Sequence, residues 1–155
     1  DVAAFRASCH RGVREIMDSE GVALRPGARE WLAFVADLGI PLGVATSSGP
    51  RLMQERLGTL HSLFAAVVTR ADVARGKPFP DLYLEAARRL GAAPSDCIAL
   101  EDSPTGARAA LAAGMPVVVI PDLVPLTTEL SGEIAGSYDS LDELRTAIGD
   151  GWRAG

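Results

Sequence analysis

The sequence has few cysteines, fewer basic than acidic residues, and no long hydrophobic run. Its two cysteines, Cys9 and Cys97, form neither a Cys-x-x-Cys motif nor a Cys/His cluster, so we expect both to be reduced packing residues. Lysine and arginine together number 15 against 20 aspartates and glutamates, which gives a net charge of −5. That balance offers no basic surface to nucleic acid or to anionic lipid.

Long apolar stretches are also missing. None reaches the length of a membrane span, and residues 1–14 carry no signal-peptide pattern. We therefore expect a cytoplasmic protein without nucleic-acid or membrane partners, and the acidic balance favours work on small molecules. At 155 residues the chain has room for one ordinary core plus a fragment of something else.

Short apolar runs alternate with helical patterns of about ten residues. Strands are predicted within 40–45, 64–69, 97–100 and 116–120, and helices over 1–19, 28–38, 50–57, 81–90 and 104–113, with a last one after Ser140. This alternation predicts an α/β fold with a Rossmann-like parallel sheet and helices on both of its faces. The run 97–100 is apolar and short, which is typical of a buried strand.

Two carboxylates, Glu101 and Asp102, stand where the third predicted strand ends. Ser103 is a good N-cap and Pro104 suits the first helical position, so a helix is predicted to begin at once. Adjacent carboxylates at the carboxyl end of a parallel strand lie in the crevice where open α/β sheets bind ligands. Hard oxygen ligands there favour Mg²⁺, and Mg²⁺ in turn favours phosphate. The alternative is that the pair only complements the dipole of the helix N-terminus.

Two other strand ends carry groups suited to a phosphoryl ligand, which needs hydrogen-bond donors, a fixed cation and a metal ion. Thr46 supplies a hydroxyl after the first strand, with Ser47 beside it at a helix start. Lys77 supplies an ammonium in the loop 75–80, which two prolines and a glycine stiffen. Each has a simpler interpretation, because Thr46 can be an ordinary strand-end hydroxyl and Lys77 a solvated loop lysine.

Other polar residues have local explanations. Asp72 and Asp81 lie in a loop and at a helix start, where capping is the favoured interpretation. His10 falls in the first predicted helix and His61 in a loop, and neither has a partner at metal-ligand spacing. We therefore place none of these four residues in the candidate site.

Three segments together resemble the haloacid dehalogenase superfamily. The runs Val-Ala-Thr-Ser-Ser at 44–48, Gly-Lys-Pro-Phe-Pro-Asp at 76–81 and Ile-Ala-Leu-Glu-Asp-Ser-Pro-Thr-Gly at 98–106, with Ala-Ala-Gly-Met at 112–115, look like its motifs two, three and four. The Glu-Asp-Ser version with Gly-Lys-Pro-x-Pro-Asp is similar to the β-phosphoglucomutase and sugar-phosphate phosphatase branch. Order and rough spacing match as well, and the resemblance spans about residues 25–149.

The resemblance implies a Mg²⁺-dependent phosphoryl-transfer hydrolase, a phosphatase or phosphomutase for a small phosphorylated metabolite such as a sugar phosphate. By this resemblance Thr46 would hydrogen-bond the phosphoryl group, and Ser47 would add a hydroxyl or backbone contact. Lys77 would neutralise the phosphoryl oxygens and the carboxylate of the nucleophile. Glu101 and Asp102 would bind Mg²⁺, with Asp102 as the direct ligand and Glu101 acting through water.

One part of the family's pattern is absent from these 155 residues. The first motif, Asp-x-Asp-Gly at the end of the first strand, carries the aspartate that becomes phosphorylated, and no such sequence occurs here. Since that strand lies at the centre of the family's sheet, we expect two open strand edges. We further expect a cap remnant over 1–24, a core without its first strand over 25–150, and a truncated chain with little or no activity.

Two other classes stay open. A non-catalytic α/β module that keeps a phosphate-sized pocket, as a binding or interaction unit, is favoured by the missing motif and opposed by the retained Thr46, Lys77, Glu101 and Asp102. A receiver-type phosphoacceptor domain also combines acids, a threonine and a lysine, but its acidic pair would come earlier in the chain than these. Related sheets carry many functions, so fold likeness alone does not separate the three.

Overall fold

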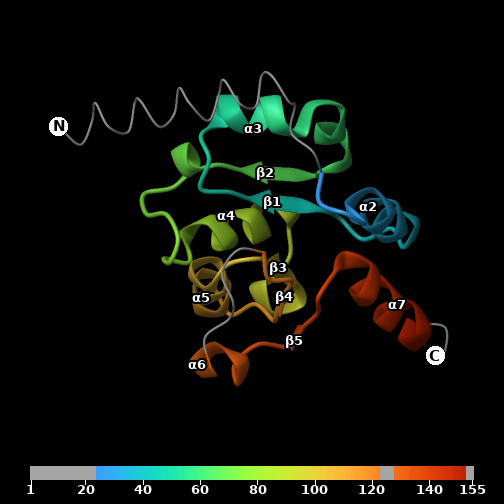
Figure 1. The fold of residues 1–155 in the computed structure, drawn as a ribbon. Helices are drawn as coiled ribbons and strands as arrows, with labels where there is room; N and C mark the ends of the chain where they lie inside the picture. Colours follow the sequence, from blue (N-terminus) through green and yellow to red (C-terminus); the bar gives the residue numbers. More distant parts are fainter. Residues whose placement is uncertain (1–23, 123–127, 153–155) are drawn as a thin grey trace.

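A computed structural model describes residues 24–122 and 128–152 (Figure 1). The helix predicted over 1–19, with Cys9 and His10, lies outside the described residues, as does nearly all of the segment interpreted as a cap remnant. Within the described ranges, no helix combines the length and the apolar character needed to cross a membrane.

Helices and strands alternate along the chain as predicted (Figure 1). Each of the four predicted strands forms but is only three residues long, and a two-residue strand near the C-terminus, β5, has no counterpart in the prediction. The elements are α2 (Ala28–Asp37), β1 (Gly43–Ala45), α3 (Pro50–Leu57), η1 (Gly58–Leu63), β2 (Ala66–Val68), η2 (Arg70–Asp72), α4 (Asp81–Leu90), η3 (Pro94–Asp96), β3 (Ala99–Glu101), α5 (Pro104–Ala112), β4 (Val117–Val119), α6 (Thr128–Ser131), β5 (Gly136–Ser137) and α7 (Leu141–Trp152).

The strands form two separate parallel sheets. β1 pairs with β2, with Val44 opposite Val67, and β3 pairs with β4, which in turn pairs with β5. Among the described residues four strand edges are therefore unpaired, one each on β1, β2, β3 and β5. The expectation that an absent first strand leaves two of these edges open stays a prediction.

Helices cover both faces of the β3–β4–β5 sheet, which confirms the predicted α/β class. On one face, residues of α4 and α5 pack with Val117 and Val119 of β4. On the other face, Trp31 and Val35 of α2 and Leu144 of α7 pack with Val118. Because side chains alternate along a strand, the odd and even valines of β4 point into different layers.

The expectation that the run 97–100 is a buried strand is wrong for half of its side chains. Ala99 is buried, but Ile98 is 67% exposed and Leu100 is 38% exposed. The cause is the two-residue period of a strand, which turns Ala99 and Glu101 toward the α4 and α5 layer and the other two residues away from it. On that second face α2 and α7 pack with the neighbouring strand β4.

Local capping signals explain where the helix after β3 begins and ends. The Ser103 hydroxyl accepts a hydrogen bond from the Gly106 N–H at 3.2 Å, and Pro104 occupies the first turn. Gly114 follows the helix with a φ of 81°, a left-handed conformation that favours glycine. The predicted limits of this helix are therefore confirmed, and its N-terminus lies directly behind Glu101 and Asp102.

Candidate functional site

Lys77 and Glu101 form an ion pair at the carboxyl end of β3. The Lys77 ammonium donates to Oε1 of Glu101, and the two side chains are 15% and 5% exposed. Lys77 is the only lysine of the 155-residue chain. The simpler interpretation of Lys77 as a solvated loop lysine is therefore wrong, because its side chain is mostly buried and its charge is paired with Glu101. A buried carboxylate such as Glu101 in turn requires a partner charge.

Glu101 accepts hydrogen bonds on both of its oxygens. Oε1 accepts from the Tyr83 hydroxyl as well as from Lys77, while Oε2 accepts from the Asp102 N–H at 3.2 Å and the Ser103 hydroxyl at 3.3 Å. These donors come from the loop before α4, from α4 itself and from the turn that opens α5. We call Lys77, Tyr83, Glu101, Asp102 and Ser103 the Lys77 cluster.

Gly106 gives Glu101 the space that it occupies. A Cβ on Gly106 would collide with the carboxylate of Glu101, so the first turn of α5 can approach the end of β3 only with glycine at this position. The carboxylate is thus enclosed by α5 on one side and by the donors on the others. Its orientation is fixed by packing as well as by hydrogen bonds.

The two neighbouring carboxyls have pKa values displaced in opposite directions. Burial acts to raise the pKa of Glu101, but the Lys77 charge and the bonds from Lys77 and Tyr83 outweigh it, so this pKa is lowered. Desolvation, followed by the negative charge of Glu101, raises the pKa of Asp102. Burial is also the first cause that raises the pKa of Tyr83, whose phenol therefore stays a proton donor.

The loop that carries Lys77 is closed by a second ion pair. Arg75 binds Asp81 through Nε and Nη2, at 3.2 and 3.0 Å, and its guanidinium lies 4.5 Å from the centre of the Phe79 ring. The Phe79 N–H donates to the carbonyl of Gly76 at 3.0 Å, which adds a turn around Lys77. The expectation that Asp81 caps the helix is wrong, because its carboxylate is turned toward Arg75 instead.

Thr46 and Ser47 lie at the carboxyl end of β1, as predicted. The Thr46 hydroxyl accepts from the Ser48 N–H at 3.1 Å, and the Thr46 N–H donates to the Val68 carbonyl at 2.9 Å. Ser47 is exposed. Within the described part of the chain no hydrogen bond or ion pair joins these residues to the Lys77 cluster, so their phosphate-binding roles stay predictions.

Glu101 and Asp102 are the carboxylates that could hold a cation here. The described residues contain no group of three or more His, Cys, Asp and Glu side chains with metal-site geometry. Mg²⁺ does not need one, because it is commonly held by one or two carboxylates together with water and substrate phosphate. Asp102 is the better placed of the two, since both oxygens of Glu101 already accept bonds from the chain.

Tyr83 is the residue of this cluster that the sequence analysis missed. It lies on the buried face of α4 beside Leu82, Ala86 and Ala87 and is 7% exposed. A phenol on an otherwise aliphatic buried face needs a hydrogen-bond partner, and that rule could have drawn attention to it. The prediction considered only the aliphatic stripe of this helix.

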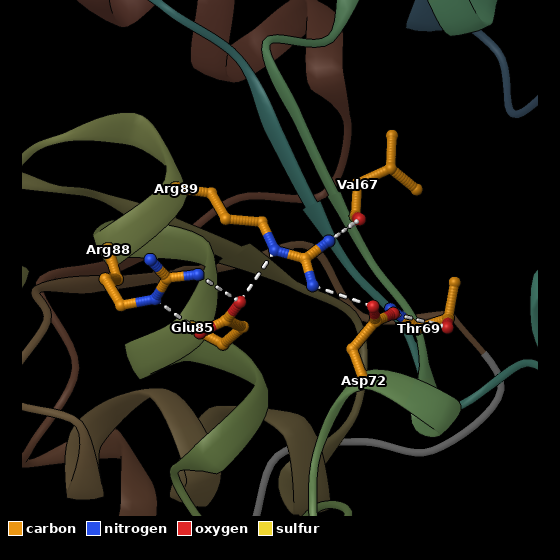
Figure 2. A network of polar contacts seen from close by, with 6 residues as sticks. All are labelled: Val67, Thr69, Asp72, Glu85, Arg88 and Arg89. Atoms are coloured by element: carbon orange, nitrogen blue, oxygen red, sulfur yellow. Dashed lines mark hydrogen bonds and ion pairs between the residues drawn. The ribbon is translucent and has the colours of Figure 1, made fainter.

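A second charged cluster joins the outer side of α4 to β2 (Figure 2). Arg89 donates to the Val67 carbonyl and to Asp72, both at 2.7 Å, and also binds Glu85. The other Asp72 oxygen accepts from the Thr69 N–H and hydroxyl, which confirms the capping interpretation of Asp72. We call the six residues drawn in Figure 2 the Arg89 network: Val67, Thr69, Asp72, Glu85, Arg88 and Arg89.

Comparisons with known proteins identify the family of this chain. The family model described as haloacid dehalogenase-like hydrolase matches residues 2–114. The plasmid-borne protein CbbY of Cupriavidus necator is 40% identical over 125 residues, which are 77% of this chain and 49% of that protein. Hexitol phosphatase A of Escherichia coli is 33% identical over 135 residues, covering 84% of this chain and 60% of that enzyme.

A solved structure supports the same assignment. CbbY from Rhodobacter sphaeroides in complex with phosphate superimposes with a TM-score of 0.77 at 33% identity, covering 89% of this chain and 65% of the other. The chain spans about half to two thirds of the length of the relatives that it matches. On the family match and these identities, the chain belongs to the haloacid dehalogenase-like hydrolases, as its motifs predict.

Proposed function

We propose that this chain supplies the phosphate-binding and Mg²⁺-binding part of a phosphatase or phosphomutase that acts on a small phosphorylated metabolite, a sugar phosphate in the first place. The observation that carries the proposal is the buried Lys77–Glu101 ion pair next to Asp102. A fixed ammonium beside a second carboxylate offers a cation for phosphoryl oxygens and an oxygen ligand for a metal.

Each residue has a distinct part in this proposal. Lys77 neutralises charge on the phosphoryl oxygens, while Thr46 and Ser47 donate hydrogen bonds to them from the end of β1. Asp102 is the direct ligand for Mg²⁺, and Glu101 holds Lys77 and reaches the ion through water. The ion, when bound, adds positive charge against the phosphoryl oxygens in the transition state.

The nucleophile is the part that these residues do not supply. The 155 residues contain no Asp-x-Asp sequence, and phosphoryl transfer through an aspartate needs that side chain. We therefore propose that the chain alone hydrolyses phosphate esters slowly or not at all, and that activity needs a longer protein. We also propose a cytoplasmic location, with 25–150 as the core unit and 1–24 as part of a cap.

Relatives guide the choice of substrate. A single-residue mutant of CbbY from Rhodobacter sphaeroides has been crystallised with xylulose 1,5-bisphosphate, and hexitol phosphatase A is named for a sugar-alcohol phosphate. Phosphorylated sugars and sugar alcohols are therefore the first substrates to test. The negative net charge of the chain also agrees with small-molecule rather than nucleic-acid substrates.

The test is Mg²⁺-dependent release of phosphate from a panel of sugar phosphates, with binding of inorganic phosphate measured on the same chain. Asp102→Asn removes the proposed metal ligand, and the pair Lys77→Met/Glu101→Gln removes the cation without leaving a buried charge. We expect Mg²⁺-dependent phosphate binding that both variants weaken, and little or no release. Rapid release by the unaltered chain would overturn the proposal that the chain alone lacks a group needed for turnover.

The non-catalytic binding module is the second candidate, and the missing Asp-x-Asp sequence favours it. A chain that is extended upstream to include an Asp-x-Asp-Gly strand separates the two candidates. Gain of Mg²⁺-dependent turnover in that longer chain identifies an enzyme. Phosphate binding without turnover in both forms identifies a binding module.

A further inference from the structure

We propose that Tyr83 is a positioning residue of the Lys77 cluster. Its side chain holds Glu101 and Lys77 in the orientation in which the Lys77 ammonium can bind phosphate. The inference deepens the proposed function and rests on it, since the site that Tyr83 positions is the phosphate site proposed above. Neither the sequence motifs nor the comparisons assign a role to this tyrosine.

The first argument is that Tyr83 touches both members of the ion pair. Its hydroxyl donates to Oε1 of Glu101, the same oxygen that accepts from Lys77. The Lys77 ammonium lies 5.0 Å from the centre of the Tyr83 ring, within the range of a cation–π contact. One side chain on α4 thus fixes the carboxylate through its hydroxyl and the ammonium through its ring.

The second argument is that α4 adds a constraint that the neighbouring turn cannot provide. The Asp102 N–H and the Ser103 hydroxyl hold Oε2 of Glu101, and both belong to the segment that contains Glu101 itself. Tyr83 and Lys77 hold Oε1 from outside that segment. Without the Tyr83 hydroxyl, Oε1 would accept a hydrogen bond from Lys77 alone. Lys77 is the group that Glu101 positions, so no other group would then fix Oε1.

The third argument concerns the alternative, in which Tyr83 only fills space. The buried cluster that contains it is otherwise built from alanines, valines and one methionine: Ala87, Ala99, Ala107, Ala109, Ala110, Ala113, Met115, Val117 and Val119. A phenylalanine would fill the same volume without bringing a hydroxyl that must be satisfied. The hydroxyl is therefore explained by its acceptor, Glu101, rather than by packing.

The test separates the effect of the Tyr83 hydroxyl from that of its ring, and an effect on the Lys77 cluster from a general loss of stability. Tyr83→Phe keeps the ring and removes only the donor. Leu82→Val is the matched control, because Leu82 is the next residue of α4, is fully buried, and belongs to a different core cluster with Val68 and Ala86. Both variants lose a buried contact, but only Tyr83→Phe alters the Lys77 cluster.

Two readouts are needed. The first is the dissociation constant of inorganic phosphate with Mg²⁺, measured by calorimetry on the 155-residue chain. The second is the side-chain NMR signal of Lys77, which needs no assignment among lysines because the chain has only one. We expect Tyr83→Phe to weaken phosphate binding roughly tenfold and to shift the Lys77 signal, while Leu82→Val changes neither.

The outcomes are distinguishable. Unchanged phosphate affinity and an unchanged Lys77 signal in a folded Tyr83→Phe chain would show that Tyr83 is a core residue and overturn the inference. If the unaltered chain binds no phosphate, the proposed function fails, and the Lys77 signal alone then decides the positioning role. If Tyr83→Phe does not fold, the unaltered chain must show a nuclear Overhauser contact between the Tyr83 ring and the Lys77 ε-methylene, and its absence would overturn the inference.

Discussion

Helix α4 contributes to two charged clusters that differ mainly in burial. On its outer side it supplies three residues of the Arg89 network, in which the Arg89 side chain is 31% exposed (Figure 2). On its inner side it supplies Tyr83 to the Lys77 cluster, in which Glu101 is 5% exposed. The same helix thus carries one charged network at the surface and one in the interior, and the two have different energetic consequences.

The Arg89 network serves the fold. Ala66 donates to the Leu42 carbonyl and Thr46 to the Val68 carbonyl, so alternation turns the backbone groups of Val67 away from β1 and toward the outer edge of the sheet. Arg89 donates to that Val67 carbonyl. Through this hydrogen bond Arg89 links α4 to β2 and covers the outer edge of β2, which hinders pairing of that edge with another chain.

The Lys77 cluster is a poor way to stabilise a fold. A buried ion pair repays its desolvation only when its geometry is excellent, and apolar residues of similar volume often do as well or better. A cluster of this kind therefore agrees better with the proposed phosphate site than with a role in stability alone. The contrast teaches that exposure, more than the number of bonds, separates the structural network from the candidate site.

The largest effect is expected when one partner of the buried pair is removed. Lys77→Met leaves the Glu101 carboxylate buried without its cation, which should cost roughly 3 to 5 kcal/mol of unfolding free energy. The double variant Lys77→Met/Glu101→Gln should recover a large part of that loss, because it removes the uncompensated charge. Chemical denaturation measures both, and a double variant no more stable than Lys77→Met would contradict the account.

Gly106→Ala should come second. Its Cβ would collide with the Glu101 carboxylate, so the carboxylate or the first turn of α5 must shift, at a cost of about 1 to 3 kcal/mol. Gly149→Ala in α7 is the matched control, since a Cβ there meets nothing within 4 Å, and it should stabilise the chain by up to about 1 kcal/mol. Equal effects of the two substitutions on the denaturation midpoint would show that Glu101 is not held against α5.

Asp72→Asn should have a smaller effect that depends on pH. Hydrogen bonds from Thr69, then from Arg89, hold the pKa of Asp72 well below its ordinary value of 3.8. A lowered pKa in the folded state stabilises the fold above the ordinary pKa, and that contribution is lost as pH falls through the folded value. We expect Asp72→Asn to cost about 1.5 kcal/mol near neutral pH, and the difference from the unaltered chain to shrink below about pH 4. A difference that stays constant down to pH 2 would count against the network.

Arg88→Gln should have the smallest effect of the four. Arg88 binds only Glu85 within the Arg89 network, at 2.7 and 2.8 Å, and its side chain is exposed. Exposed ion pairs within one helix contribute little because solvent screens them. Thermal unfolding of Arg88→Gln should match that of the unaltered chain, and a clear loss would show that the outer network is more cooperative than its exposure indicates.

Local patterns allowed the helices to be predicted closely. The limits of α3 and α4 agree with the predicted ones, and Ser103, Pro104 and Gly114 marked the ends of α5, because caps and glycines act within a few residues. The strands were harder, since apolarity does not tell whether both faces of a strand are covered. Ile98 and Leu100 are exposed for that reason, which only the tertiary arrangement decides.

The residues of the candidate site that lie in sequence motifs were predicted, and those outside the motifs were not. Lys77 and Glu101 were chosen independently, 24 residues apart, and the fold joins them in one ion pair. Tyr83 was not chosen, because its partner is distant in sequence, although a phenol on an aliphatic helix face already indicates that its hydroxyl needs an acceptor. The closure of the loop by Arg75 and Asp81 was missed for the same reason, since helix-start aspartates usually serve as caps.

The most direct test of the central claim is chemical modification of Lys77 with and without phosphate. Because the chain has a single lysine, an amine reagent and mass spectrometry report on the site alone, with the N-terminal amine as internal control. Inorganic phosphate with Mg²⁺ should slow modification of Lys77 and leave the N-terminal amine unaffected, and Asp102→Asn should reduce that protection. Modification of Lys77 at an unchanged rate in a large excess of phosphate and Mg²⁺ would contradict the assignment of this cluster as a phosphate site.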